Sequence, residues 1–161
     1  MTTATPSYGA AATLTCTSSG LASSSLLTVG RQSTVADNTS DLADDSMVGG
    51  KLVTSATTTT NTQIQIWAFG TYDGTTYSAS AGATDAGFTP DTGAKNLMKL
   101  LTIIPNITTT AVTYAWGPFS VAQAFGGTMP SKWGIWIVHN VGTPLAAGSE
   151  IKYTPVKYAS A

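Results

Sequence analysis

The sequence predicts an all-β protein, specifically a two-layer antiparallel β-sandwich that is jelly-roll-like. Three observations favour this class. Thr, Ser and Gly are abundant, and together with β-branched residues they are poor in helix interiors but suit strands and turns. Seven Pro and 16 Gly divide the 161 residues into short segments. Several of these segments alternate with the period of two that is typical of a strand.

The expected strands follow one another with turns between them. They cover residues 12–17, 62–71, 97–104, 111–116, 119–121, 133–140 and 150–157. With further short strands, about eight or nine in all, they fit two packed layers. An immunoglobulin sandwich is the nearest alternative, but its Cys–Trp–Cys core is not available here.

Individual segments carry more specific expectations. The run 97–104 is more continuously apolar than the other segments, which predicts a strand in the middle of two layers. Pro155 predicts a sheet edge or a strand end. Asp73-Gly74 favours a tight hairpin over residues 72–77. Gly49-Gly50 and Gly126-Gly127 are interpreted as turns, and residues 123–125 as a short helical turn. We expect an extended N-terminal arm (residues 1–10) and a single β-sandwich domain (residues 11–161).

Composition excludes several classes of function. Charged residues make up 9% of the chain, against a typical share of about 25%. Seven Lys and Arg against eight Asp and Glu cannot neutralise many phosphates, so we expect no nucleic-acid partner. The most apolar windows, 97–107 and 133–141, are shorter than the ~20 residues of a membrane span. The N-terminal residues lack the pattern of a secretory signal, and Cys16 has no partner cysteine, so we expect folding in a reducing cytoplasm.

The residues that could carry chemistry are few. His139 is the one histidine and Glu150 the one glutamate, and the chain has no Gly-x-Ser-x-Gly motif. A hydrolase that used His139 or Glu150 is therefore the weakest hypothesis, and we expect no enzyme activity and no cofactor. Cys16 is interpreted as a small core residue, with a reactive thiol as the alternative.

An acidic loop over residues 37–45 is the candidate metal site. One His and one Cys cannot form a zinc site without carboxylates, whereas calcium takes six to eight oxygen ligands. The spacing does not match an EF-hand, so turn capping is the alternative role. The weak calcium candidates are Asp37, Asp41, Asp44 and Asp45.

Aromatic residues gather around the Asp73-Gly74 turn. Trp67, Tyr72 and Tyr77 could stack on sugar rings, as in a carbohydrate-binding module. Buried, the same side chains would supply volume to a core of small residues or to a subunit interface.

Several short motifs resemble those of small structural proteins from the virions of tailed bacteriophages. The motifs are Val29-Gly30-Arg31-Gln32-Ser33 with Asp37-Asn38, Gln63-Ile64-Gln65-Ile66-Trp67 through Tyr72-Asp73-Gly74-Thr75-Thr76-Tyr77, Trp116-Gly117-Pro118-Phe119-Ser120-Val121, Met129-Pro130-x-x-Trp133-Gly134 and His139-Asn140. The resemblance covers residues 25–157. It implies a jelly-roll-like fold and a capsid decoration or cement protein on the exterior of the virion, made in the host cytoplasm. The implied partners are the major capsid protein and the chain itself, as a homotrimer.

The resemblance leaves two virion locations open. A decoration protein would bind the head, with Thr2, Thr3, Thr5 and Pro6 reaching along the shell as an arm. A tail, collar or fibre protein would sit elsewhere on the particle. The carbohydrate-binding module remains the alternative outside this group.

Overall fold

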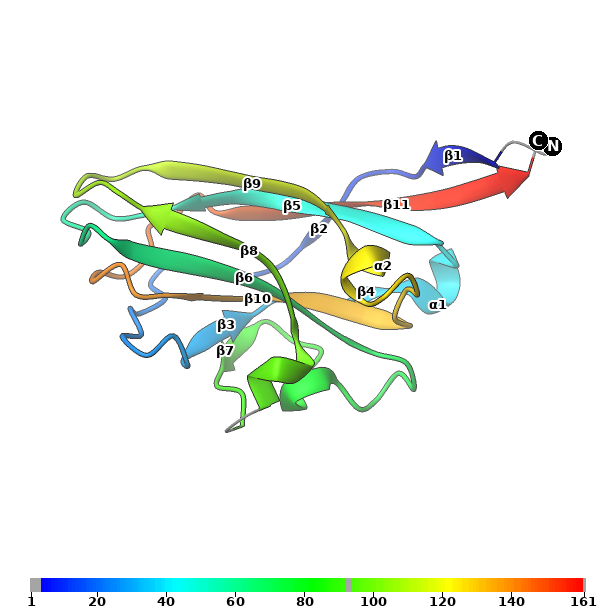
Figure 1. Ribbon diagram of the computed structural model, residues 1–161, viewed down its shortest axis with the longest axis horizontal. Coiled ribbons are helices and arrows are strands. Elements are labelled where there is room, and N and C mark those ends of the chain that lie inside the picture. The colour runs from blue at the N-terminus through cyan, green and yellow to red at the C-terminus, as the bar shows by residue number, and fades with distance from the viewer. Residues whose placement is uncertain (1–3, 92–93, 161) are drawn as a thin grey trace.

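The structure is a computed structural model that describes residues 4–91 and 94–160. Two antiparallel sheets pack face to face (Figure 1), which confirms the predicted β-sandwich. The first sheet holds β1 (Ala4–Tyr8), β2 (Ala12–Leu14), β5 (Asp45–Val53), β9 (Thr113–Ser120) and β11 (Glu150–Ser160). The second holds β3 (Gly30–Gln32), β4 (Ala36–Asp37), β6 (Thr62–Thr71), β7 (Ala86–Phe88), β8 (Lys99–Asn106) and β10 (Lys132–His139).

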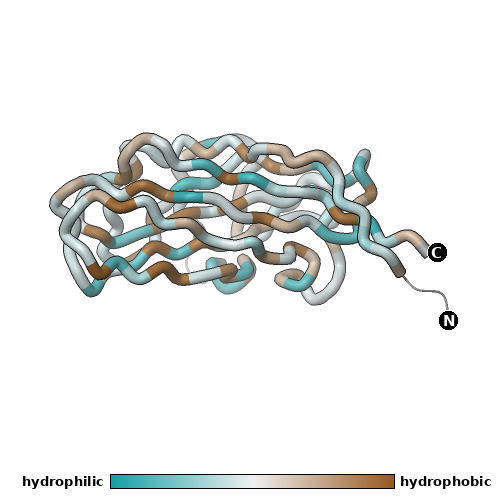
Figure 2. The backbone as a smooth tube through the Cα atoms, turned by 90° about the horizontal axis from the view of Figure 1, so that it is seen from above, coloured by the Kyte–Doolittle hydropathy of each residue, from teal (hydrophilic) through white to brown (hydrophobic). Residues whose placement is uncertain are grey.

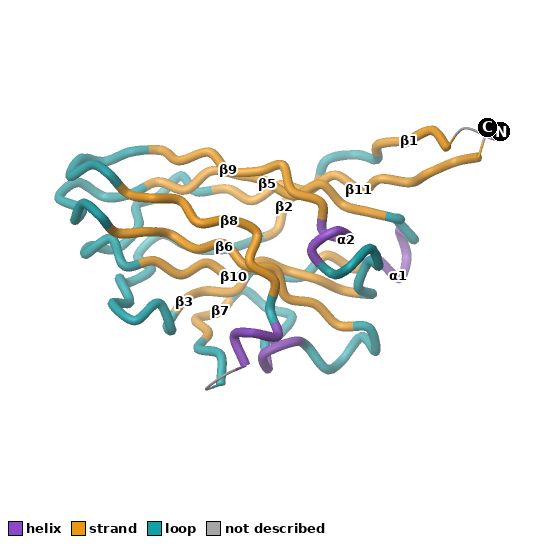
Figure 3. Tube along the Cα trace, viewed as in Figure 1, coloured by secondary structure: helices purple, strands orange, loops and turns teal. Residues whose placement is uncertain are grey.

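Within residues 4–91 and 94–160, helical structure is limited to short turns between strands (Figure 3). These are α1 (Asn38–Asp41), α2 (Val121–Ala124) and the 3₁₀ turns η1 (Ser78–Ser80) and η2 (Ala94–Leu97). α2 confirms the short helical turn predicted near residue 123. Within the described residues, no helix has the length and apolar character to cross a membrane.

The strand pairing has the order of a jelly roll. Early strands pair with late ones, in sequence from the outside inwards: β2 with β11, β3 and β4 with β10, β5 with β9, and β6 with β8. The pairs alternate between the two sheets, as they do when one long hairpin rolls up into two layers. The jelly-roll-like prediction is therefore confirmed, with β1 and β7 as additions.

The core lies between the sheets, and β10 runs through the middle of the second sheet. Its side chains alternate with the period of two expected of a strand: Trp133, Ile135 and Ile137 pack into the space between the sheets, and Trp136 and Val138 face the other way. Apolar and polar residues also alternate along the strands in Figure 2. Across the core, Trp133 packs edge-on against Tyr153 of β11, with 5.3 Å between ring centroids.

A second apolar cluster covers the outer face of the second sheet. Phe69, Trp136 and Val138 are fully buried there, under a layer that includes Ala79, Ala81 and Met98. Because this layer covers the outer face of the sheet, side chains on both faces of β6 are buried.

Several local predictions are wrong. Residues 72–77 turn the chain, but β6 ends at Thr71 and the chain continues into η1, so no tight hairpin forms. Asp73 instead accepts hydrogen bonds from Thr71 Oγ1 and from the amides of Thr75 and Thr76. Gly49-Gly50 lies within β5 and is not a turn.

Two further errors concern residues 97–104 and Pro155, whose places in the sheets are the reverse of those predicted. The apolar run forms β8, an edge strand with exposed apolar side chains, and not a strand between two layers. Pro155 lies within β11, an interior strand, opposite the break between β1 and β2 where Gly9 N–H donates to its carbonyl. A proline fits there because the neighbouring strand is interrupted.

Candidate functional site

His139 is a structural residue in the interior. It is fully buried at the end of β10. Its Nε2 lies 3.0 Å from the carbonyl oxygen of Leu21, and its Nδ1 accepts a 3.4 Å hydrogen bond from the amide of Val141. Nδ1 as acceptor makes Nε2 the protonated nitrogen, so the neutral ring is satisfied on both sides by backbone. Both ring nitrogens are therefore engaged in a structural role.

The neutral form of His139 should make stability depend on pH. Burial lowers the pKa of His139 and outweighs the hydrogen bond to Leu21, which acts in the opposite direction. The unfolded chain then binds the proton more readily, so this stability is complete above the unfolded pKa of about 6.5 and falls as pH drops below it. We expect the free energy of unfolding to fall between pH 7 and pH 5, with a slope of up to about 1.4 kcal/mol per pH unit. Urea unfolding at both pH values, beside His139→Gln, measures this. A slope unchanged by the substitution would contradict it.

The acidic loop does not assemble into one site. Asp37 caps α1 by accepting from Thr39 N–H, and Asp44 accepts from the amide of Tyr158. Asp45 is buried and accepts from the amides of Ser46 and Ala122, while Asp41 is exposed. Among the residues that the structure describes, no three His, Cys, Asp or Glu side chains are grouped to hold a metal ion. The carboxylates of Asp37, Asp44 and Asp45 thus serve as acceptors for three separate backbone segments.

Cys16 packs against the core beside an ion pair. Arg31 Nε lies 2.6 Å from Asp85 Oδ1, and the amide and hydroxyl of Thr17 donate to Asp85 Oδ2. Burial is the main cause that raises the pKa of Cys16 to about 12, and the charge of Asp85 adds to it. Burial also raises the pKa of Asp85, but the hydrogen bonds from Arg31 and Thr17 outweigh it, so that pKa lies below its usual value.

Cys16 should therefore label slowly in the folded protein. At pH 8 a thiol with a pKa of about 12 has a far smaller thiolate fraction than a free cysteine. We expect iodoacetamide to modify native Cys16 at least about a hundredfold more slowly than the urea-unfolded chain. Mass spectrometry of timed samples measures the ratio, and equal rates would contradict a core role.

The three aromatic candidates separate into two places. Trp67 is half-buried on the outer face of the second sheet, where Lys95 Nζ lies 4.8 Å from the centroid of its ring. Lys95 Nζ is also 5.4 Å from the ring of Trp136, and it donates to the carbonyl of Leu27 and to Gln65 Oε1. Sequence reasoning missed Lys95, since no local motif marks it. Trp67 is therefore a structural partner of this cation.

Tyr72 and Tyr77 line a shallow groove near the start of β8. The groove has a volume of about 450 Å³, and Leu97, Lys99 and Phe125 also line it. Tyr72 is 61% exposed, whereas Tyr77 packs edge-on against Phe69. Thr71, Thr76 and Ser78 line the same groove, and the hydroxyls of Thr71 and Ser78 already bond to Asp73 and to the backbone of Gly70. The groove can contact an apolar surface or a sugar ring, and its lining includes no carboxylate and no histidine.

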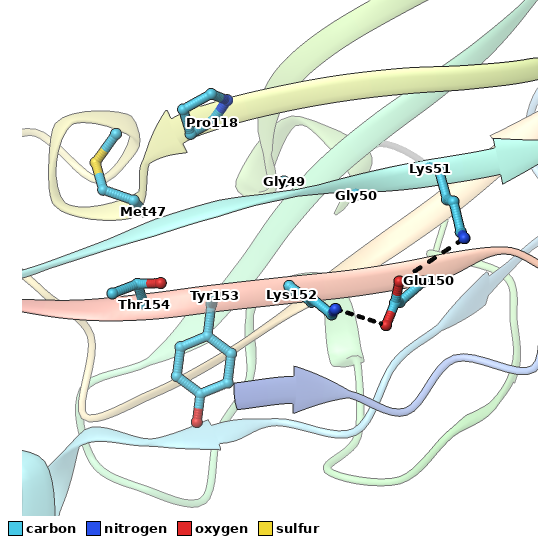
Figure 4. Close-up of a pocket in the computed structure, with 9 residues that line it drawn as sticks. All are labelled: Met47, Gly49, Gly50, Lys51, Pro118, Glu150, Lys152, Tyr153 and Thr154. Carbon is cyan, nitrogen blue, oxygen red and sulfur yellow. Dashed lines mark ion pairs between the residues drawn. The ribbon is translucent and has the colours of Figure 1, made fainter. Parts of the chain in front are cut away.

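A second depression lies on the outer face of the first sheet (Figure 4). Its volume is about 360 Å³, and Gly49 and Gly50 form its floor between Met47, Pro118 and Thr154. Glu150 lies 3.1 Å from Lys152 Nζ and 4.0 Å from Lys51 Nζ, as the dashed lines show. Glu150 is thus the centre of a surface ion-pair group.

The N-terminal segment pairs with a strand of the same chain. β1 pairs with the last part of β11, from Ala4 opposite Ser160 to Tyr8 opposite Val156. This two-stranded ribbon extends beyond the sandwich (Figure 1), and all five residues of β1, including Thr5 and Pro6, are exposed. Thr2 and Thr3 lie outside the described residues. The ribbon thus presents exposed side chains outside the sandwich.

Comparison of the chain with family models, curated proteins and solved structures found no match.

Proposed function

We propose that the protein is a non-enzymatic structural protein of a phage virion, and that it decorates the capsid by binding the lattice of the major capsid protein. The observation that carries the proposal is the jelly-roll strand order, an architecture used by viral capsid and lectin domains. The motif resemblance to virion proteins of tailed phages supports the same function. Fold-level analogy is the basis of this step.

The residues available for chemistry support a structural role. The side chain of His139 is held by backbone groups, Cys16 has a raised pKa, and Glu150 pairs with two lysines on an open face. The surface is poor in charge, since 9% of the residues are charged and the net charge is −1. Such a surface lets many copies pack closely without repulsion.

The β1–β11 ribbon is the proposed contact with the shell. An isolated two-stranded ribbon is marginally stable in water, so a ribbon without packing gains most from a partner. Tyr8 and Tyr158 are 66% and 53% exposed on it. Aromatic side chains of this kind are enriched at the centres of protein interfaces.

Binding to heads tests the proposal directly. The purified chain is mixed with heads, and separately with tails, from the phage that encodes it after the gene has been deleted, and each mixture is sedimented. We expect saturable binding to heads, weakened by Tyr8→Ala with Tyr158→Ala and unchanged by Leu26→Ala on an exposed loop. Binding to tails alone would favour the tail, collar or fibre role, and binding to neither would contradict a virion role.

Glycan binding is the second candidate function, and the Tyr72–Tyr77 groove favours it. Tyrosine side chains recognise sugar rings by stacking on them, and the groove has two tyrosines. Serine and threonine side chains, which also line it, form hydrogen bonds with sugar hydroxyls. A glycan array followed by titration with Tyr72→Ala tests this role. Binding that the substitution does not weaken would place any glycan elsewhere.

A further inference from the structure

The edge of the second sheet at β8 differs from the other sheet edges. Among the described strands, β2, β4 and β7 are two or three residues long. β1 contains Pro6, and β9 contains Gly117-Pro118 beside a bulge. Short strands, prolines and bulges are the devices that keep sheet edges from pairing with other chains.

β8 carries its protecting residues at its ends. Its one charge, Lys99, begins the strand and its proline, Pro105, lies near the end. Between them, Leu100–Ile104 contains no charge, Gly or Pro. Half of the N–H and C=O groups of such a strand face away from β6, toward an open edge.

Apolar side chains accompany this open backbone. Leu100 lies opposite Trp67 and Ile103 opposite Gln65 in the pairing with β6, so both belong to the outer face of the sheet. They are 43% and 46% exposed. A bulge between Leu100 and Thr102 breaks the alternation and brings residues three apart onto one face.

We propose that β8 pairs antiparallel with β8 of a second copy of this chain, about a two-fold axis at Ile103. The axis lies away from the bulge and places Ile103 of one copy opposite Ile103 of the other. The contact is self-complementary, because the two-fold axis places Ile103 against Ile103 and Thr102 against Ile104, and brings backbone donors opposite acceptors. The two copies of Lys99 lie roughly 27 Å apart along the paired strands, so they do not repel each other.

The contact does not depend on the proposed capsid role. It joins the second sheets of two copies, whereas the proposed contact with the shell uses the β1–β11 ribbon of the first sheet. It also predicts an even-numbered assembly, in place of the homotrimer that the resemblance implies. Failure of one proposal therefore leaves the other standing.

Sedimentation velocity of the full chain over a range of concentrations tests the pairing. We expect a dimer whose dissociation constant rises at least about a hundredfold in Ile103→Lys, because two like charges would meet at the axis. Ala115→Lys, at an exposed position on the β9 edge, is the matched control and should leave the constant unchanged. A monomer, a trimer, or a dimer that Ile103→Lys does not weaken would overturn the proposal.

A cysteine placed at the axis gives an independent readout. Residues opposite each other in antiparallel strands have Cα atoms about 4.5–5.5 Å apart, within the range of a disulfide. Under mild oxidation, Ile103→Cys should give a covalent dimer on a non-reducing gel, while Ala115→Cys stays monomeric. The native Cys16 does not interfere, because burial raises its pKa. Equal cross-linking of the two variants would overturn the assigned axis.

Discussion

Replacing Trp133 with alanine is expected to lower the free energy of unfolding by about 3–5 kcal/mol. The side chain is 1% exposed and packs against Tyr153, so it joins β10 of one sheet to β11 of the other. Its loss leaves a cavity between the sheets in a protein of ordinary total stability, about 5–15 kcal/mol. Urea unfolding followed by circular dichroism measures the change.

An exposed residue provides the control for Trp133. Leu26 is 81% exposed, so Leu26→Ala should change the free energy of unfolding by less than about 0.5 kcal/mol. A loss of under about 1.5 kcal/mol in Trp133→Ala would contradict a position between the two layers.

Asn106→Leu is expected to cost about 3 kcal/mol or more, although it replaces a polar side chain by an apolar one. Asn106 is fully buried, and its Nδ2 donates to the carbonyls of Thr59 and Thr108, at 2.7 and 3.1 Å. Its Oδ1 accepts from Tyr114 Oη at 2.9 Å. Leucine would remove these three hydrogen bonds, each worth about 1 kcal/mol, which join β8 to the chain at Thr59 and Thr108 and to Tyr114 of β9.

Tyr114→Phe separates the parts of this network. It removes one donor and should cost about 1 kcal/mol. In the double variant, the loss should be less than the sum of the two single losses, because the hydroxyl has already lost its acceptor. Strictly additive losses, measured by urea unfolding, would contradict the hydrogen bond between Tyr114 and Asn106.

The strands that sequence predicts best are those whose two faces differ in composition or are both apolar. Residues 133–140 and 62–71 form β10 and β6 as predicted, because burial on each side fixes the alternation of their side chains. β5 was missed, since Asp45, Ser46, Gly49 and Gly50 resemble a turn. The reason for glycine is tertiary: a Cβ on Gly50 would overlap the carbonyl oxygen of Glu150 in the paired strand.

The candidate site was less predictable than the fold. Proximity in sequence groups Trp67 with Tyr72 and Tyr77. In the structure, Trp67 packs against the second apolar cluster with Lys95 over its ring, and only the two tyrosines line the groove. The apolar run 97–104 indicated a strand, and hydropathy alone could not say whether its partners come from the same chain. Both outcomes depend on contacts between residues distant in sequence.

The proposed capsid role is tested most directly by electron cryomicroscopy of virions of the tailed phage that the proposal takes as the source of this chain. The account predicts density for a two-layer β-sandwich on the outside of the head, with the β1–β11 ribbon against the major capsid protein. Intact infectious particles whose heads lack such density would contradict it.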